Sequence, residues 1–188
     1  EFRRLRANEY WDWYYAARHH GLPSRLLDWS ENPITALWFA VQELEPPEKR
    51  KRYPHVWMLE PQTLNLKSFR EGDLRIPVTG DGVTEYWLPR CVSREEKRTF
   101  RRDKREYSNK HPIAIYPPFT NSRLVAQRGN FTVHGADTRP IEDQFRGAEV
   151  KLHQIRLPFS ERAIGKIREE LELIGVNRAA FFPSADHL

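Results

Sequence analysis

Cysteine is nearly absent from this chain of 188 residues, in which Cys91 is the only one. A single cysteine excludes any disulfide within the chain and favours a reducing compartment. Long apolar runs are also missing, because the longest, around Ile34 to Val41, has the length of a core helix rather than of a membrane span. The sequence E-F-R-R at the start lacks the pattern of a signal peptide. We therefore expect a soluble, cytoplasmic protein.

Several catalytic motifs are missing as well. The chain has no G-x-x-x-x-G-K-[ST] or G-x-G-x-x-G run, and nothing supports the nucleophile elbow of a serine hydrolase. Its seven histidines are scattered, and the adjacent pair His19 and His20 would face different directions on most backbones. We expect no metal site.

Size and charge allow one domain with a substantial core of two packed layers. The chain has 31 basic and 26 acidic residues, a formal net charge of +5 and an isoelectric point near 9.4. This moderate excess of positive charge favours an anionic partner, such as a nucleotide or a nucleic acid.

The most informative stretch runs from Arg18 to Val41, where polar residues lie directly before an apolar helix. Asn32 is a favoured N-cap, and Pro33 suits the first helical position. Apolar residues then recur with helical spacing at Ala36, Leu37, Ala40, Val41 and Leu44. The free N–H groups at the helix start suit a phosphate, a carboxylate, or Asp28 acting as a local partner.

The rest of the chain alternates between helix and strand patterns, which predicts an α+β fold: a single compact domain with a mixed or antiparallel sheet and helices packed around it. We expect a helix over Glu1–Ala17 that buries Phe2, Leu5, Tyr10, Trp13 and Ala17, and a surface loop over Glu45–His55. Helices should begin at Ser93 and at Ser160, the second burying Ile164, Ile167, Leu171 and Ile174 and ending at Gly175. The expected strands are Val56–Glu60, Glu85–Leu88, Ile113–Tyr116, Phe131–Val133 and Val150–Leu157.

The Arg18–Val41 stretch resembles the core pattern of the FRG domain family, Q-H-x-G-x-P-T-R-L-L-D-W-T-x-N-P-x-x-A-L-x-F-A. The matching residues are His19, Gly21, Pro23, Arg25, Leu26, Leu27, Asp28, Trp29, Asn32, Pro33, Ala36, Leu37, Phe39 and Ala40. The sequence departs from the pattern at Arg18, His20, Ser24 and Ser30, and the two serines keep the hydroxyl of the usual threonine.

A second stretch resembles the family's later signature, a basic residue followed by Q-x-G-x-F. Here these residues are Arg123, Gln127, Gly129 and Phe131. The amide of Gln127 can donate and accept hydrogen bonds, which suits the recognition of a ribose, an amide or a base edge. The alternative is a glutamine that satisfies backbone groups at the end of a strand. The resemblance covers positions 1–188, and the family's Phe/Trp-Arg-Gly motif does not stand before the first helix.

The order of these parts is more distantly similar to that of ADP-ribosyltransferases, which implies a cleft that binds NAD as substrate. In that resemblance Ser30 is the hydroxyl near the nicotinamide and Gln127 is the ribose contact, while His19 is a base or ligand contact. The implied catalytic residues are Gln127, His19 and Asp28, and the implied cofactor-binding residues are Ser24, Arg25, Ser30, Asn32 and Arg123. The implied function is an ADP-ribosyltransferase-like or NAD-consuming enzyme that acts on a nucleic acid or another macromolecular acceptor.

Two alternatives stay open from the sequence. In the first, the chain is a non-catalytic module that binds a nucleotide or a nucleic acid. In the second, the signature has a purely structural role, in which Arg25 and Asp28 form a buried ion pair. In either functional case the helix expected from Ser93 would present a basic face to a polyanion. That face comprises Arg94, Lys97, Arg98, Arg101, Arg102, Lys104 and Arg105.

Overall fold

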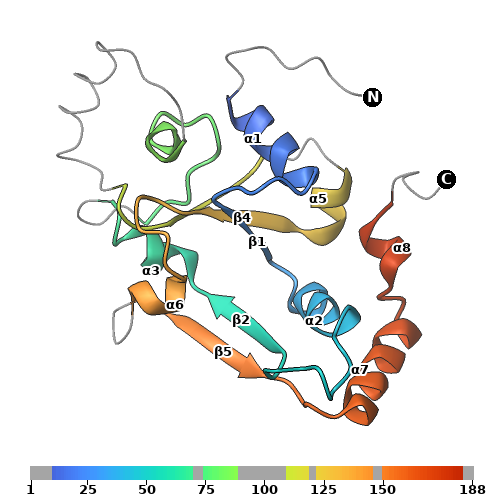
Figure 1. Ribbon diagram of the computed structural model, residues 1–188. Helices are drawn as coiled ribbons and strands as arrows, with labels where there is room; N and C mark the ends of the chain where they lie inside the picture. The colour runs from blue at the N-terminus through green and yellow to red at the C-terminus, as the bar shows by residue number, and fades with distance from the viewer. Residues whose placement is uncertain (1–9, 70–73, 89–108, 119–121, 146–149, 184–188) are drawn as a thin grey trace. The chain divides into compact units, whose positions relative to one another are not determined.

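The computed structural model describes residues 10–69, 74–88, 109–118, 122–145 and 150–183 (Figure 1). These residues form helices and short antiparallel sheets, so the expected α+β class is confirmed. The helices are α1 (Tyr10–His19), α2 (Pro33–Gln42), α3 (Pro61–Asn65), the 3₁₀ helix η1 (Thr84–Trp87), α5 (Ser122–Gln127), α6 (Ile141–Gln144), α7 (Glu161–Leu173) and α8 (Arg178–Phe181). The strands are β1 (Leu26–Ser30), β2 (His55–Leu59), β3 (Ile113–Ile115), β4 (Gly129–Val133) and β5 (Leu152–Arg156).

The strands form one sheet with the order β1-β4-β3 and a second sheet made of β2 and β5. Strands β3 and β4 are antiparallel, with Ile113 opposite Val133. At one end of β1 and β4 the backbone N–H of His134 donates to the carbonyl of Arg25, and at the other end Glu31 donates to Arg128. These strands therefore also run in opposite directions. Strands β2 and β5 pair in antiparallel orientation (Figure 1), and α7 is the next element after β5.

The chain divides into two compact units by its own contacts. Unit 1 comprises residues 1–27, 61–118 and 131–150, and unit 2 comprises residues 28–60, 119–130 and 151–188. Near the predicted site, the boundaries between the two units fall within strands: one follows Leu27 in β1, and the other follows Asn130 in β4.

The core of unit 1 surrounds β3 and β4, where Ile113, Ile115 and Val133 are fully buried. Helix α3 is fastened to β3 by Asn65, which is also fully buried. Its Oδ1 accepts a hydrogen bond from the backbone N–H of Ala114 (2.7 Å), and its Nδ2 donates to the carbonyl of Ala114 (3.1 Å). A buried amide with all these groups bonded costs little, and it fixes how the helix meets the strand.

The core of unit 2 lies between α2, α7 and α8, and its buried members are Trp38, Val41, Ile164, Leu171 and Phe181. The two predicted helix starts are confirmed, because Asn32 Oδ1 accepts from Ile34 N and Ser160 Oγ accepts from Ala163 N. The expected apolar faces need correction. In α2 the buried residues are Thr35, Trp38 and Val41, and Ile174, expected in the α7 core, is 66% exposed beyond the helix end.

Helix α1 is turned relative to the sequence-based expectation. Tyr10 and Trp13, which we expected to be buried, are about half exposed. Trp11 is buried instead, and its indole N–H donates to a carboxylate oxygen of Glu85, while the ring of Tyr15 packs on Phe131. The aromatic residues at positions 10–15 lie on two adjacent faces of the helix, so helical periodicity alone does not determine which face is buried.

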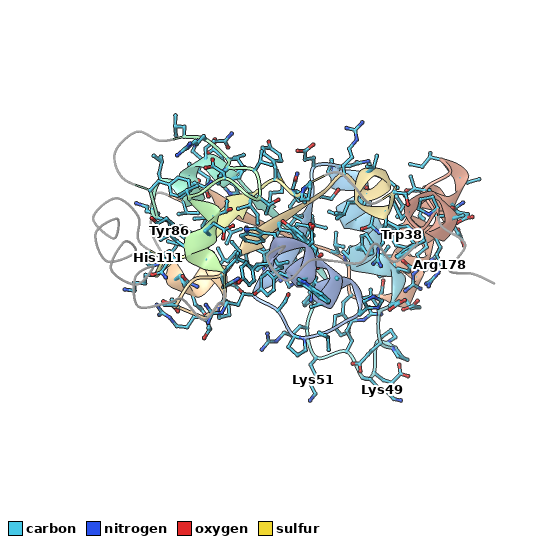
Figure 2. All side chains as sticks on the ribbon, turned by 90° about the horizontal axis from the view of Figure 1, so that it is seen from above. Trp38, Lys49, Lys51, Tyr86, His111 and Arg178 are labelled. Carbon is cyan, nitrogen blue, oxygen red and sulfur yellow. The ribbon has the colours of Figure 1, made fainter. Side chains whose placement is uncertain are left out.

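One further expectation was wrong, and another was confirmed with one exception. The segment Glu85–Leu88 is not a strand, since residues 84–87 form η1. The loop expected at Glu45–His55 does expose Lys49 and Lys51, which point away from the ribbon in Figure 2, but it also buries Arg50. The guanidinium of Arg50 binds the carbonyls of Glu45 and Phe159 and the carboxylate of Glu161. The basic helix expected from Ser93 lies outside the described residues.

Candidate functional site

The two signature stretches meet in unit 2, where the end of β1 is bonded to the end of α5. The hydroxyl of Ser30 donates to the backbone carbonyl of Gln127 (2.7 Å), and the backbone N–H of Glu31 donates to the carbonyl of Arg128 (3.1 Å). We call this junction, made of residues 28–32 and 127–130, the β1–α5 junction. It contains four of the predicted site residues, Asp28, Ser30, Asn32 and Gln127.

Ser30 connects the junction to the start of α2. Its Oγ accepts a hydrogen bond from the backbone N–H of Asn32 (3.1 Å) while donating its only proton to Gln127. Asn32 in turn caps α2, because its Oδ1 accepts from the N–H of Ile34 (3.0 Å). Ser30 therefore has no proton left to donate, although its oxygen keeps one further lone pair for a ligand donor.

The nitrogen and the oxygen of the Gln127 side-chain amide are in different situations. Its Nε2 donates to the backbone carbonyl of Phe181 in α8 (3.1 Å), so this half of the amide is part of the scaffold. Its Oε1 accepts no hydrogen bond from the residues that the structure describes. Because Gln127 is only partly buried, this oxygen is an acceptor that a ligand hydroxyl can reach.

Strain and a buried acceptor occur beside Gln127. Arg128 has φ of +45°, a left-handed conformation that costs a residue with a Cβ about 1 kcal/mol. The side chain of Asn130 donates from Nδ2 to the carboxylate of Glu31 (2.9 Å), and its Oδ1 is buried with no hydrogen-bond partner among the described residues. Backbone strain and unsatisfied polar atoms concentrate at functional sites, which is why the junction is a candidate site.

Arginines and aromatic rings gather over α5 and α8, next to the junction. The guanidinium of Arg123 lies 4.5 Å from the ring centre of Phe182, and that of Arg178 lies 5.2 Å from it. Phe182 also contacts Trp38, which Figure 2 marks together with Arg178. Arg123, expected to bind the cofactor, is thus held against an aromatic ring and contributes positive charge near Gln127.

The remaining predicted site residues belong to unit 1. His19 is the last residue of α1, and Ser24 accepts a hydrogen bond at Oγ from the backbone N–H of Leu26 (3.2 Å). Arg25 is exposed, and its Nη1 donates to the carbonyl of Gly135 (3.3 Å). The hydroxyl of Tyr14 accepts from the backbone N–H of Arg25 (2.6 Å).

The buried ion pair expected between Arg25 and Asp28 is wrong, because both residues are exposed. Arg25 directly precedes β1 and Asp28 lies in the middle of this strand. In a strand, side chains three apart point to opposite faces, so a spacing that would pair them on a helix does not do so here.

A polar cluster in unit 1 was missed by sequence reasoning. Burial lowers the pKa of the His134 imidazole, which lies near Arg25 and Asp137. Hydrogen bonds from Arg139 lower the pKa of Asp137 to about 2. Burial raises the pKa of Tyr14, an effect that its bond from the backbone of Arg25 opposes. The only sequence signal was the dipeptide His134-Gly135, which follows the second signature stretch shortly after Phe131.

The family model of the FRG domain matches residues 2–49, which confirms the resemblance for the part of the chain that contains α1, β1 and α2. The match covers about a quarter of the 188 residues and does not reach Gln127. Searches among curated proteins and among solved structures found no match.

In the described segments, no helix has the length and apolar character needed to cross a bilayer. Over the same residues, His, Cys, Asp and Glu side chains do not gather in any group of three or more that could hold a metal ion.

Proposed function

We propose that the chain is an ADP-ribosyltransferase-like, NAD-consuming enzyme that acts on a nucleic acid or another macromolecular acceptor. The observation that carries the proposal is the hydrogen bond from Ser30 to Gln127. The resemblance assigns these two residues to the nicotinamide and to the ribose of the same substrate. Two contacts to adjacent parts of one nucleoside must lie close together, and a direct hydrogen bond between the two residues meets that requirement.

The proposed reaction breaks the bond between the nicotinamide nitrogen and C1′ of its ribose. The electron pair leaves with nicotinamide, the acceptor nucleophile forms the new bond to C1′, and the acceptor loses a proton. Gln127 Oε1 accepts a hydrogen bond from a ribose hydroxyl and directs its negative dipole end at the developing oxocarbenium charge. A neutral amide stabilises that charge less than a carboxylate would, so we expect slow turnover. Asp28 and His19 stay proposed catalytic residues.

The second candidate is a non-catalytic nucleotide-binding module, and one observation favours it. The only hydroxyl proton of Ser30 is used within the protein, and so is one of the two N–H groups of Gln127 Nε2. What remains for a ligand is their acceptor oxygens and the second N–H of Gln127 Nε2, which suffice for binding a ribose but add little to catalysis.

Incubation with NAD separates the two functions. We would measure NAD binding by calorimetry and nicotinamide release by chromatography, with DNA, RNA and protein acceptors. The enzyme proposal predicts nicotinamide release that Gln127→Ala reduces about tenfold or more, as expected for the loss of one transition-state contact. The matched control is Gln154→Ala, an exposed glutamine of β5. Binding without release would favour the module, and the absence of both would disprove the nucleotide proposal.

The proposed nucleic-acid acceptor would be bound through the basic face Arg94–Arg105, which lies outside the described residues. Binding through this face must weaken steeply as salt rises, because counterion release scales with the number of phosphates neutralised. Charge reversal at Arg101 and Arg102 should weaken all sequences about equally. If no nucleic acid binds at low ionic strength in a gel-shift assay, this class of acceptor is wrong.

A further inference from the structure

We propose that Arg25, whose carbonyl accepts a hydrogen bond from the backbone N–H of His134, forms a binding site for a phosphate group in unit 1. The site deepens the expected cofactor-binding role of Arg25, and it stands whether or not the chain turns over NAD. It lies where β1 begins and β4 ends, and it is built entirely from residues of unit 1.

The first step of the argument is that Arg25 is held in place. Its backbone N–H donates to the hydroxyl of Tyr14 (2.6 Å), and its carbonyl accepts from the backbone N–H of His134 (2.9 Å). Its Nη1 donates to the carbonyl of Gly135 (3.3 Å). Three bonds to three different residues fix both the backbone and the direction of the guanidinium, so a bound anion would order little further chain.

The second step is that the charge of Arg25 is available. The residue is exposed, and it forms no ion pair with any residue in the described ranges. A guanidinium has five N–H donors in a planar fork, and only one nitrogen is occupied here. The remaining edge matches the oxygens of a phosphate, which accept paired, charge-assisted hydrogen bonds.

The third step concerns the groups around His134. Its imidazole is half-buried, and the positive charge of Arg25 and the carboxylate of Asp137 both act on it. The carboxylate would repel an anion if it were unpaired. Arg139 binds it in a bidentate manner, with Nη2–Oδ2 at 2.6 Å and Nε–Oδ1 at 3.0 Å, which cancels most of that charge. Arg25 therefore remains the dominant charge beside His134, whose ring is hydrogen-bonded to the backbone of Arg25 and Arg139.

The fourth step is that the backbone here is tightly constrained. A Cβ on Gly135 would collide with the backbone carbonyl of Asn109. The adjoining chain is fastened by hydrogen bonds from Ala136 N to Asn109 O (2.8 Å) and from Asp137 N to Lys110 O (2.9 Å). The carbonyl that holds Arg25 thus belongs to a rigid part of unit 1, as a preformed binding site requires.

The test is a titration of the isotope-labelled chain with inorganic phosphate at constant ionic strength, followed by NMR. We expect a saturable shift that is weakened about tenfold or more by Arg25→Gln, as for the loss of a charge-assisted hydrogen bond. The control is Arg52→Gln, which removes the same charge from an exposed arginine of unit 2 and should change nothing. Parallel titrations with ADP and with a 5′-phosphorylated oligonucleotide identify the source of the phosphate by competition.

The absence of a saturable shift, or equal binding by wild type and Arg25→Gln, would overturn the proposal. Should Arg25→Gln fail to fold, as judged by circular dichroism, Arg25→Lys replaces it. Lysine keeps the charge but lacks the planar fork, so it should bind phosphate measurably more weakly than wild type does, and equal binding would again contradict the site. Phosphate binding and nicotinamide release are separate measurements, so failure of this site is distinguishable from failure of the proposed enzyme.

Discussion

Replacing Gln127 by glutamate tests the double role of this residue most sharply. The change keeps the size of the side chain but removes the Nε2 donor that lies 3.1 Å from the carbonyl of Phe181. At neutral pH a carboxylate oxygen would then face a carbonyl oxygen. The Phe181 carbonyl then loses its hydrogen bond, which should lower the free energy of unfolding by about 2 kcal/mol. The loss is no larger because Gln127 is only half-buried, so water can partly replace the missing donor.

The destabilisation should depend on pH, with a sign that follows from the protonation of the new carboxyl. A protonated glutamic acid can donate to Phe181, whereas the ionised form cannot, so folding raises the pKa of this carboxyl above its ordinary value of about 4.3. The favourable contact is fully present below the ordinary pKa and is lost as the pH rises through the raised one. The difference in stability from wild type should therefore be small at pH 4 and full at pH 7.

Thermal and urea unfolding, followed by circular dichroism at the two pH values, provide the measurement. For a chain of this length, a loss of about 2 kcal/mol corresponds to a fall in Tm of roughly 4–8 °C. Gln154→Glu is the control, because it introduces the same charge at an exposed position of β5. If both variants are equally stable at pH 7, or if the gap does not close at pH 4, the bond between Gln127 and Phe181 does not support the scaffold.

Three further substitutions test the structure by unfolding measurements. Gly135→Ala should destabilise by about 3 kcal/mol or more, because its Cβ would collide with backbone, whereas Gly82→Ala has open space and should be nearly neutral. Thr35→Val should stabilise by about 1 kcal/mol, since the Thr35 hydroxyl is buried without a partner in the described part of the chain; a loss of stability would show that it is bonded. Arg50→Met should cost on the order of 2–3 kcal/mol and Lys49→Met almost nothing, and equal effects would contradict the structural role of Arg50.

The candidate site was only partly predictable from the sequence. The resemblance selected Ser30 and Gln127, and the structure brings them together at the β1–α5 junction. It did not indicate that Gln127 Nε2 would be used by Phe181, a residue 54 positions further along the chain. No local pattern encodes such a bond, since it depends on where α8 lies against α5. The same limit applies to the unit 1 site, where His134 meets Arg25 through the pairing of distant strands.

The sequence by itself determined the features that depend on neighbouring residues. The caps of α2 and α7 need only a side-chain oxygen next to a helix start, and the end of α7 needs only Gly175, whose φ is +76°. These interactions span a few positions, so their energies are present in any fold that contains the segment.

Tertiary structure alone decided which face of each helix is buried and which polar groups meet. Trp11 is buried rather than Trp13 because its indole N–H reaches the carboxylate of Glu85 and the nearby ring of Tyr15 packs on Phe131 of β4. Arg50 is buried in a loop of charged residues because the carbonyls of Glu45 and Phe159 and the carboxylate of Glu161 converge on it. Burial depends on the residues that surround a side chain in the fold. The two aromatic faces of α1 are almost equivalent in sequence, and so are the four basic residues 49–52, so only their tertiary contacts decide which of them is buried.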